Sequence, residues 1–270
     1  MLMKTVFILT DFSSTADNAA AFGFELASFA GADIVLFHAY SVPVAIPESY
    51  IDIEPEAIRK AAEQQLLDLA RQLRKTDLQP VEIIAAEGDF PDVAWKHALQ
   101  YESVVLVNGM KHKEGWMERI AGTTILQLAK NLKSPLLVVP EEVNYIPFGE
   151  IVFAVDTDIS NETESLEILR SMAQRYHASI NIVRMLKDKE PVPVMYAASH
   201  FINSCEKASF QFVTGDNPSV AIETFCNARN ASLLVLMPHH HNFLERLFAK
   251  STTRSILFHG HLPLLLLPEE

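Results

Sequence analysis

The sequence predicts an α/β fold built twice, as two tandem units that each contain a five-stranded parallel sheet with helices on both faces. Short runs that are apolar at every position alternate with amphipathic stretches, which is the pattern of parallel strands covered on both sides. The alternation starts again in the second half of the chain, with matching segments. At 270 residues the chain is long enough for two such units.

In the first unit, the expected strands are apolar runs at 5–9, 33–38, 81–86, 103–107 and 135–139. The first helix should begin after Ser13 or Ser14, whose hydroxyls can cap a helix, and end at Gly31, which tolerates a left-handed conformation. Further amphipathic stretches predict helices near 55–75, 91–101 and 122–132. Strands separated by helices in this way are joined by right-handed crossovers.

The second unit repeats this order, with strands expected at 153–155, 179–185, 210–214, 232–236 and 263–267. Helices are expected at 162–176, 220–230 and 251–258. The segment Gly88-Asp89-Phe90-Pro91 of the first unit returns as Gly215-Asp216-Asn217-Pro218. The repeats align with a deletion between residues 185 and 214, so the second helix of this unit should be short or rearranged. These repeats predict domains at 1–140 and 150–270, and the proline and charge content of PEEVNYIPFGE (140–150) predicts a linker at 141–149.

Composition excludes several classes of function. A formal net charge of -12 argues against binding to nucleic acid, because phosphates would be repelled. Two cysteines, Cys205 and Cys226, make neither a disulfide framework nor a metal quartet. No segment reaches the roughly twenty apolar residues that span a bilayer. The opening MLMKTVFILTDF is cut short by Asp11, so we interpret it as a strand and expect a cytoplasmic protein without a membrane partner.

Ligands of open parallel sheets bind at the carboxyl ends of the strands. Asp11 follows the first strand and Gly109 the fourth. A glycine lets the backbone approach phosphate oxygens closely, and the helix expected from Gly122 offers free N–H groups and a partial positive charge. Thr123 and Thr124 add hydroxyl donors. Positive charge nearby comes from Lys111, Lys113 and Arg119. These features predict a cradle for an anion after the fourth strand.

With these residues in place, the whole chain resembles a tandem universal stress protein, two copies of the Rossmann-like Usp domain. The opening TDFS (10–13), the apolar strand that ends in His38 and the closing strand after Pro135 are typical of that family. Its ATP-binding members carry G-x2-G-x9-G-[S/T] after the fourth strand. This chain keeps the spacing, with His112 in place of the second glycine between Gly109 and Gly122.

The resemblance implies an adenine nucleotide, ATP or AMP, as the ligand of the first domain. Asp11 would contact the nucleoside end and the backbone of Ala39 the adenine. The phosphate end would lie against Gly109, His112, Gly122, Thr123 and Thr124. A surviving turn without any ligand is the alternative interpretation of the same residues.

In the second copy, VNGMKHKEGWMERIAGTT (107–124) returns as LMPHHHNFLERLFAKSTT (236–253). Pro238 stands where Gly109 stood, and no glycine is left to admit a phosphate, so we expect a degenerate site although Asp156 persists. Five histidines gather near this region, at 239, 240, 241, 259 and 261. Zinc would suit such ligands, but His ligands alone at this spacing are unspecific, and an exposed polar loop explains them better, so we assign no metal.

Catalytic motifs such as G-x4-G-K-[S/T], H-E-x-x-H and G-x-S-x-G are absent from the sequence. Asp11 is the one loop acid that a hydrolytic mechanism could use, so we expect a non-catalytic regulatory protein, with residual ATP hydrolysis as an open alternative. A rival hypothesis is a scaffold or interaction protein without nucleotide, whose halves pair through the apolar segments 135–139 and 263–267. A homodimer, a protein partner at the loop 39–53 and an apolar small molecule beneath it are further alternatives.

Overall fold

The first half of the computed structural model supplies five strands, β1 (Thr5–Leu9), β2 (Asp33–Tyr40), β3 (Val81–Glu87), β4 (Val104–Met110) and β5 (Leu136–Pro140). The second half supplies β6 (Glu150–Val155), β7 (Ser179–Leu186), β8 (Ala208–Thr214), β9 (Leu233–Met237) and β10 (Leu264–Leu266). The structure describes residues 3–43, 54–76, 79–111, 124–155, 163–186, 198–214, 218–237 and 262–268.

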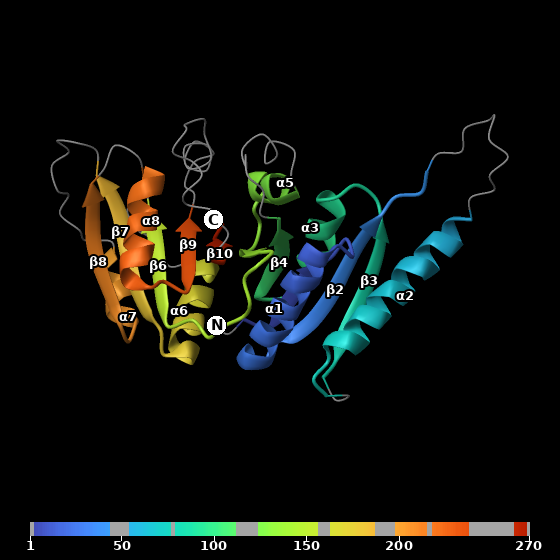
Figure 1. Ribbon diagram of the computed structural model, residues 1–270, viewed down its shortest axis with the longest axis horizontal. Helices are drawn as coiled ribbons and strands as arrows, with labels where there is room; N and C mark the ends of the chain where they lie inside the picture. Colours follow the sequence, from blue (N-terminus) through green and yellow to red (C-terminus); the bar gives the residue numbers. More distant parts are fainter. Residues whose placement is uncertain are drawn as a thin grey trace.

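All ten strands join one sheet with the order β3-β2-β1-β4-β5-β10-β9-β6-β7-β8. Within each half the strands are parallel and follow the same order, so the predicted α/β architecture is confirmed. The edge strands β3 and β8 lie near opposite ends of the molecule (Figure 1).

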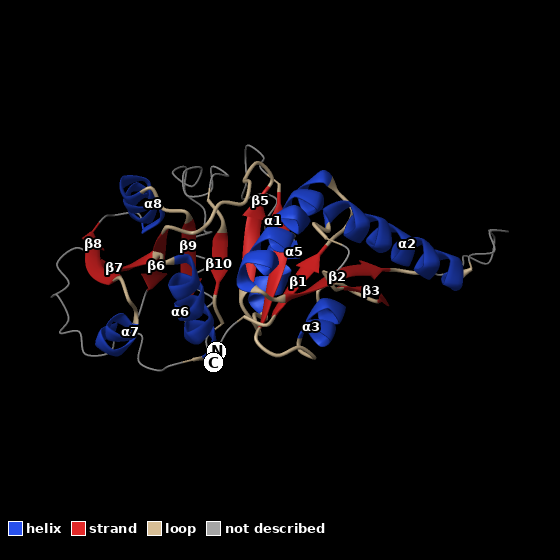
Figure 2. Ribbon diagram, turned by 90° about the horizontal axis from the view of Figure 1, so that it is seen from below, coloured by secondary structure: helices blue, strands red, loops and turns tan. Residues whose placement is uncertain are grey.

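Helices cover both faces of this sheet (Figure 2). One apolar core lies under α1 (Ser14–Ala30), α2 (Pro55–Leu73), α6 (Glu164–Tyr176) and α7 (Ala198–Ser204). The core on the other face lies under α3 (Asp92–Ala98), α5 (Thr124–Lys130) and α8 (Pro218–Arg229). Among the described residues, no helix combines the length and apolar character that crossing a membrane requires.

Local chemistry explains the ends of the first helix. The Ser13 hydroxyl accepts a hydrogen bond from the Ala16 amide at 3.3 Å, which caps α1 as the sequence predicts. Gly31 ends the helix with φ of 68°, in the left-handed region that glycine enters without steric cost. In the second half, α7 has 7 residues where α2 has 19, and residues 187–197, which precede α7, lie outside the described residues, so the predicted shortening stays a prediction.

The two halves join where β5 and β10 pair antiparallel, as the apolar segments at the end of each half predict. Leu136, Leu137 and Val138 lie opposite Leu266, Leu265 and Leu264, and all six side chains are buried. This pairing removes two strand edges that would otherwise expose unpaired backbone groups.

The segment 141–149, expected as a linker, is packed against helices of both halves. Phe148 is fully buried and its ring lies 6.3 Å from that of Phe22 in α1 and 4.9 Å from that of Tyr176 in α6. The hydroxyl groups of Tyr145 and Tyr176 lie 2.7 Å apart. The proline and charge content of 140–150 predicted a linker, and the aromatic residues of the same segment supply the packing surface.

Candidate functional site

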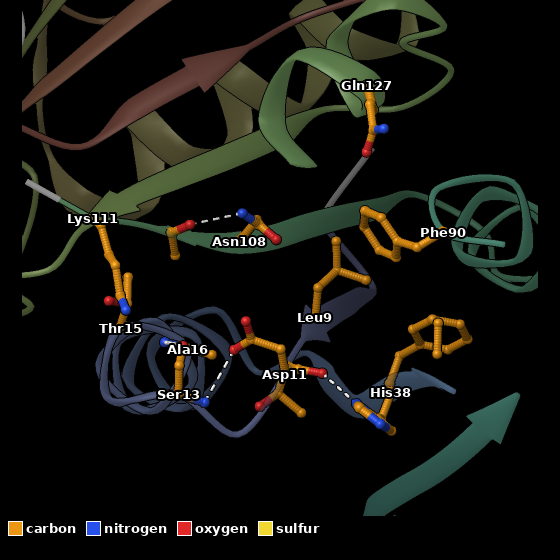
Figure 3. A pocket seen from close by; sticks show the side chains of 14 residues that line it. Leu9, Asp11, Ser13, Thr15, Ala16, His38, Phe90, Asn108, Lys111 and Gln127 are labelled. Carbon is orange, nitrogen blue, oxygen red and sulfur yellow. Dashed lines mark hydrogen bonds between the residues drawn. The ribbon is translucent and has the colours of Figure 1, made fainter. Parts of the chain in front are cut away.

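A cavity of about 460 Å³ opens at the carboxyl ends of β1, β2 and β4 (Figure 3). Its walls come from four strand ends or connections and from α1 and α5. The lining residues are Leu9, Thr10, Asp11, Ser13, Thr15, Ala16, Phe37, His38, Ala39, Phe90, Asn108, Gly109, Lys111 and Gln127. This is the place where open α/β sheets bind ligands.

The alternation of β4 determines which of its residues reach the cavity. Val105 and Val107 pack into the core beneath α1, and Leu106 into the core on the opposite face. Successive strand residues point to opposite faces, so Asn108 continues the face of Leu106 and Gly109 the face of Val107. At the end of the strand the first of these faces opens into the cavity, and the second meets α1.

The first turn of α1 packs so closely against position 109 that only glycine fits there. A Cβ at this position would lie 2.5 Å from the Thr15 carbonyl oxygen and 2.9 Å from the carbonyl carbon. The sequence pattern placed Gly109 in a loop and explained it by phosphate approach. Instead it lies inside β4, opposite Val139 of β5, and the close helix accounts for the missing side chain.

Asp11 lies in a tight turn between β1 and α1. Its Oδ1 atom accepts a hydrogen bond from the Ser13 amide at 3.0 Å, while the Phe12 amide donates to the Thr10 hydroxyl at 3.0 Å. Phe12 has φ of 60°, which few non-glycine residues adopt. These bonds hold the exposed carboxylate of Asp11 at the rim of the cavity, with its second oxygen available to a ligand (Figure 3).

His38 holds the ends of β1 and β2 together beside this turn. Its Nδ1 atom lies 2.8 Å from the Thr10 carbonyl oxygen. Because a carbonyl oxygen only accepts, Nδ1 carries the proton and donates. The imidazole also lies 4.4 Å from the Phe12 ring. His38, near the carboxyl end of β2, therefore positions the backbone that carries Asp11.

Three of the residues predicted from the sequence, Asp11, Ala39 and Gly109, line the same cavity. Thr124 is the first residue of α5, and its side chain lies outside the described residues. The same holds for all of His112, Gly122 and Thr123, and for the second-copy positions Asp156, Pro238, His241 and 249–251. The histidines at 239–241, 259 and 261 are also outside, and within the described ranges no group of three or more His, Cys, Asp or Glu residues could hold a metal.

Sequence reasoning did not identify the contributions of Thr10, Phe37, Phe90, Asn108 and Gln127 to the cavity. For Asn108 a signal was present, because it is the polar residue that follows the apolar run 104–107. Phe90 follows the repeated Gly-Asp pair, in the connection between β3 and α3. It lines the cavity only because this connection lies beside the carboxyl ends of the neighbouring strands in the folded chain. Lys111, chosen for its charge, does reach the cavity, and its side chain is exposed.

A second cavity, of about 700 Å³, lies at the amino ends of β4 and β5, beside the start of α6. Several of its polar groups are already paired. The Ser103 hydroxyl donates to Glu164 at 3.0 Å, and Glu102 forms an ion pair with Lys4. Ligands of such sheets usually bind at the carboxyl ends of the strands, whereas this cavity lies at the amino ends. The cavity beside Asp11 is therefore the better candidate for a ligand site.

The fold and this cavity place the chain in the class of doubly wound α/β proteins, whose ligand sites lie at the strand ends. The model of the universal stress protein family matches residues 3–140, and the chain belongs to this family.

Solved structures extend the likeness of the fold over both halves. A universal stress protein from Archaeoglobus fulgidus DSM 4304 is 14% identical, covers 98% of this chain and 96% of its own, and superposes with a TM-score of 0.71. A functionally unknown protein from Pseudomonas aeruginosa PAO1 is 15% identical, with coverages of 98% and 92% and a TM-score of 0.53. No curated protein matches the chain.

Proposed function

We propose that this chain is a non-catalytic regulatory stress protein that binds an adenine nucleotide, ATP or AMP, in the cavity of its first half. The observation that carries the proposal is the convergence of Asp11, Ala39 and Lys111 on one cavity of about 460 Å³ at the strand ends. A concave cleft of this size, lined by both apolar and polar residues, is large enough for a small molecule.

The order of the strands suggests how the nucleotide would lie. Ala39, on β2, would offer its backbone to the adenine, and Asp11, after β1, would meet the sugar. Lys111, after β4, would supply positive charge to the phosphates. His112, Gly122, Thr123 and Thr124 would complete the phosphate end, as the family motif implies. Bound nucleotide would then stabilise the connections after β1, β2 and β4, and so change what docks there.

The described part of the cavity favours binding over catalysis. Its one carboxylate is Asp11, and one oxygen of that carboxylate is engaged by the Ser13 amide. Phosphate hydrolysis needs a group that positions water together with groups that neutralise the developing charge. We therefore assign the nucleotide a regulatory role. The second half, with Pro238 in place of the motif glycine, is proposed to lack a nucleotide site, and the domain division at 1–140 and 150–270 belongs to the same proposal.

Thermal unfolding with and without ATP tests the proposal. A ligand that binds only the folded state stabilises it by about 2.7 kcal/mol at a hundredfold excess over its Kd. Lys111→Ala should weaken ATP binding by about three- to tenfold, since one charged contact is lost. Lys130→Ala, which removes an exposed lysine at the end of α5, is the matched control and should leave affinity unchanged. An unchanged melting temperature at millimolar ATP would refute nucleotide binding.

A second candidate is a scaffold protein that works without nucleotide. The antiparallel pairing of β5 with β10 favours it, because this pairing makes one continuous sheet from both halves. The pairing is compatible with either function, so the discriminating measurement is mass spectrometry of what accompanies the freshly purified protein. A nucleotide in the denatured extract supports the first proposal, and a stable protein partner without nucleotide supports the second.

A further inference from the structure

Asn108 is a buried amide at a position where the strand pattern calls for an apolar residue. It follows the apolar run 104–107 on β4, and the residue is 8% exposed. Its neighbours in the cavity wall include Leu9, Phe37 and Phe90. A polar group in such surroundings is unfavourable unless it forms hydrogen bonds, so the amide needs partners for both of its ends.

One end of the amide has a partner and the other faces the cavity. The Asn108 Nδ2 atom donates to the Gly109 carbonyl oxygen at 2.7 Å. Because that carbonyl can only accept, the orientation of the amide is determined, and Oδ1 points to the other side, into the space above Leu9 (Figure 3). Among the residues that the structure describes, none donates a hydrogen bond to Oδ1. A ligand in the cavity would meet an acceptor that the described part of the chain leaves without a donor.

The place of this acceptor indicates which part of a nucleotide it would meet. β1 and β4 are adjacent and parallel, with Ile8 opposite Val107, so Asn108 and Asp11 border the cavity from neighbouring strand ends. Ala39, proposed to face the base, lies on β2 beyond β1, and Lys111 lies beyond the end of β4. The middle of the cavity therefore presents two acceptors, a carboxylate and an amide oxygen. The sugar of a nucleotide carries its hydroxyl donors at this middle position.

We propose that Asn108 Oδ1 accepts a hydrogen bond from a ribose hydroxyl and thereby selects ribonucleotides over deoxyribonucleotides. This assignment rests on the proposed nucleotide site. Asp11 and Asn108 together would hold the two hydroxyls of the sugar from neighbouring walls. A site whose buried acceptor is left unpaired by a deoxy analogue discriminates against that analogue.

Isothermal titration of the full chain with ATP, 2′-deoxy-ATP, 3′-deoxy-ATP and ITP tests the assignment. The wild type should bind ATP about 3- to 10-fold more tightly than one of the two deoxy analogues, which is the range of one net hydrogen bond. Asn108→Leu, which suits the apolar neighbours, should bind ATP and that analogue equally. Asn108→Thr retains an acceptor and should keep part of the preference. Gln127→Leu removes another amide from the cavity wall and is the matched control, with selectivity preserved.

The outcomes separate this inference from the proposed function. Unchanged selectivity in Asn108→Leu, or equal wild-type affinity for ATP and both deoxy analogues, overturns the role of Asn108 while nucleotide binding stands. Loss of preference for ATP over ITP in Asn108→Leu overturns the sugar assignment, because the amide would then contact the base. Absence of binding by any nucleotide to the wild type overturns both proposals, and it is seen before a variant is made.

Discussion

Replacing Gly109 with alanine should destabilise the fold before it affects any ligand. The new Cβ would lie 2.5 Å from the Thr15 carbonyl oxygen, and real Cβ contacts are essentially never below 3.0 Å, so β4 and α1 must separate by at least the 0.5 Å difference. The atoms in the way belong to the helix backbone, which cannot rotate aside. Forcing extra volume into such a packed contact costs about 1–3 kcal/mol. For large domains this lowers the melting temperature by roughly 2–4 °C per kcal/mol.

The chain offers a matched control in Gly149. A Cβ there meets nothing within 4 Å, and its backbone is outside the left-handed region. Gly149→Ala should be neutral or stabilise the protein by up to about 1 kcal/mol, because it reduces the entropy of the unfolded chain. Urea unfolding followed by far-UV circular dichroism gives the midpoint and slope for both variants. Equal stability of Gly109→Ala and Gly149→Ala would show that helix packing does not account for the glycine.

Other predictions concern tyrosines and cysteines. The Tyr145 and Tyr176 hydroxyls lie 2.7 Å apart, so replacing either tyrosine with Phe should lower the free energy of unfolding in urea by about 0.5–1.5 kcal/mol. The double variant should lose little more, because both changes remove the same hydrogen bond. Additive losses in the double variant would argue against this hydrogen bond. Burial, with a neighbouring glutamate, raises the pKa of Tyr101 to about 12. The unfolded chain loses this proton near pH 10, so stability should fall from about pH 10 to 12, and Tyr101→Phe should lessen the fall. Burial also raises the pKa of the Cys226 thiol to about 12. Iodoacetamide at neutral pH should therefore modify the more exposed Cys205 first, which peptide mass spectrometry of the labelled protein would show. Equal labelling rates of the two cysteines would contradict this.

The sequence predicts the strands well because parallel strands buried on both faces have few competing interpretations. The run 5–9 coincides with β1, and the other strands of the first half begin within a residue of their expected starts. Their carboxyl ends extend further than expected, as in β4, which continues to Met110. Hydrogen bonding to the neighbouring strand β5, which continues to Pro140, sustains those last residues, and a single segment does not reveal its neighbour.

The candidate site was harder to predict because its residues come from separate elements. Asp11 and Lys111 follow strands directly, so their place could be derived from chain order. The contact of Thr15 with Gly109 depends on how α1 crosses β4, which no local pattern contains. The packing of Phe148 is likewise a property of two helices distant in sequence. Composition predicted a linker there from the two prolines and three glutamates of 140–150, although the same window holds four aromatic or aliphatic side chains.

Because helix packing explains the glycine at position 109, the repeated motif is weaker evidence for a nucleotide site than its sequence alone suggests. A glycine that a helix backbone requires would be retained whether or not a nucleotide binds, so its presence in the first half is weak support for a ligand. Stronger support comes from groups that the fold does not need, namely the exposed Lys111 and two oxygens, one of Asp11 and Oδ1 of Asn108, that receive no hydrogen bond from the described residues. These three groups give the cavity its chemistry, and variants of them test the function without first disturbing the contact between α1 and β4.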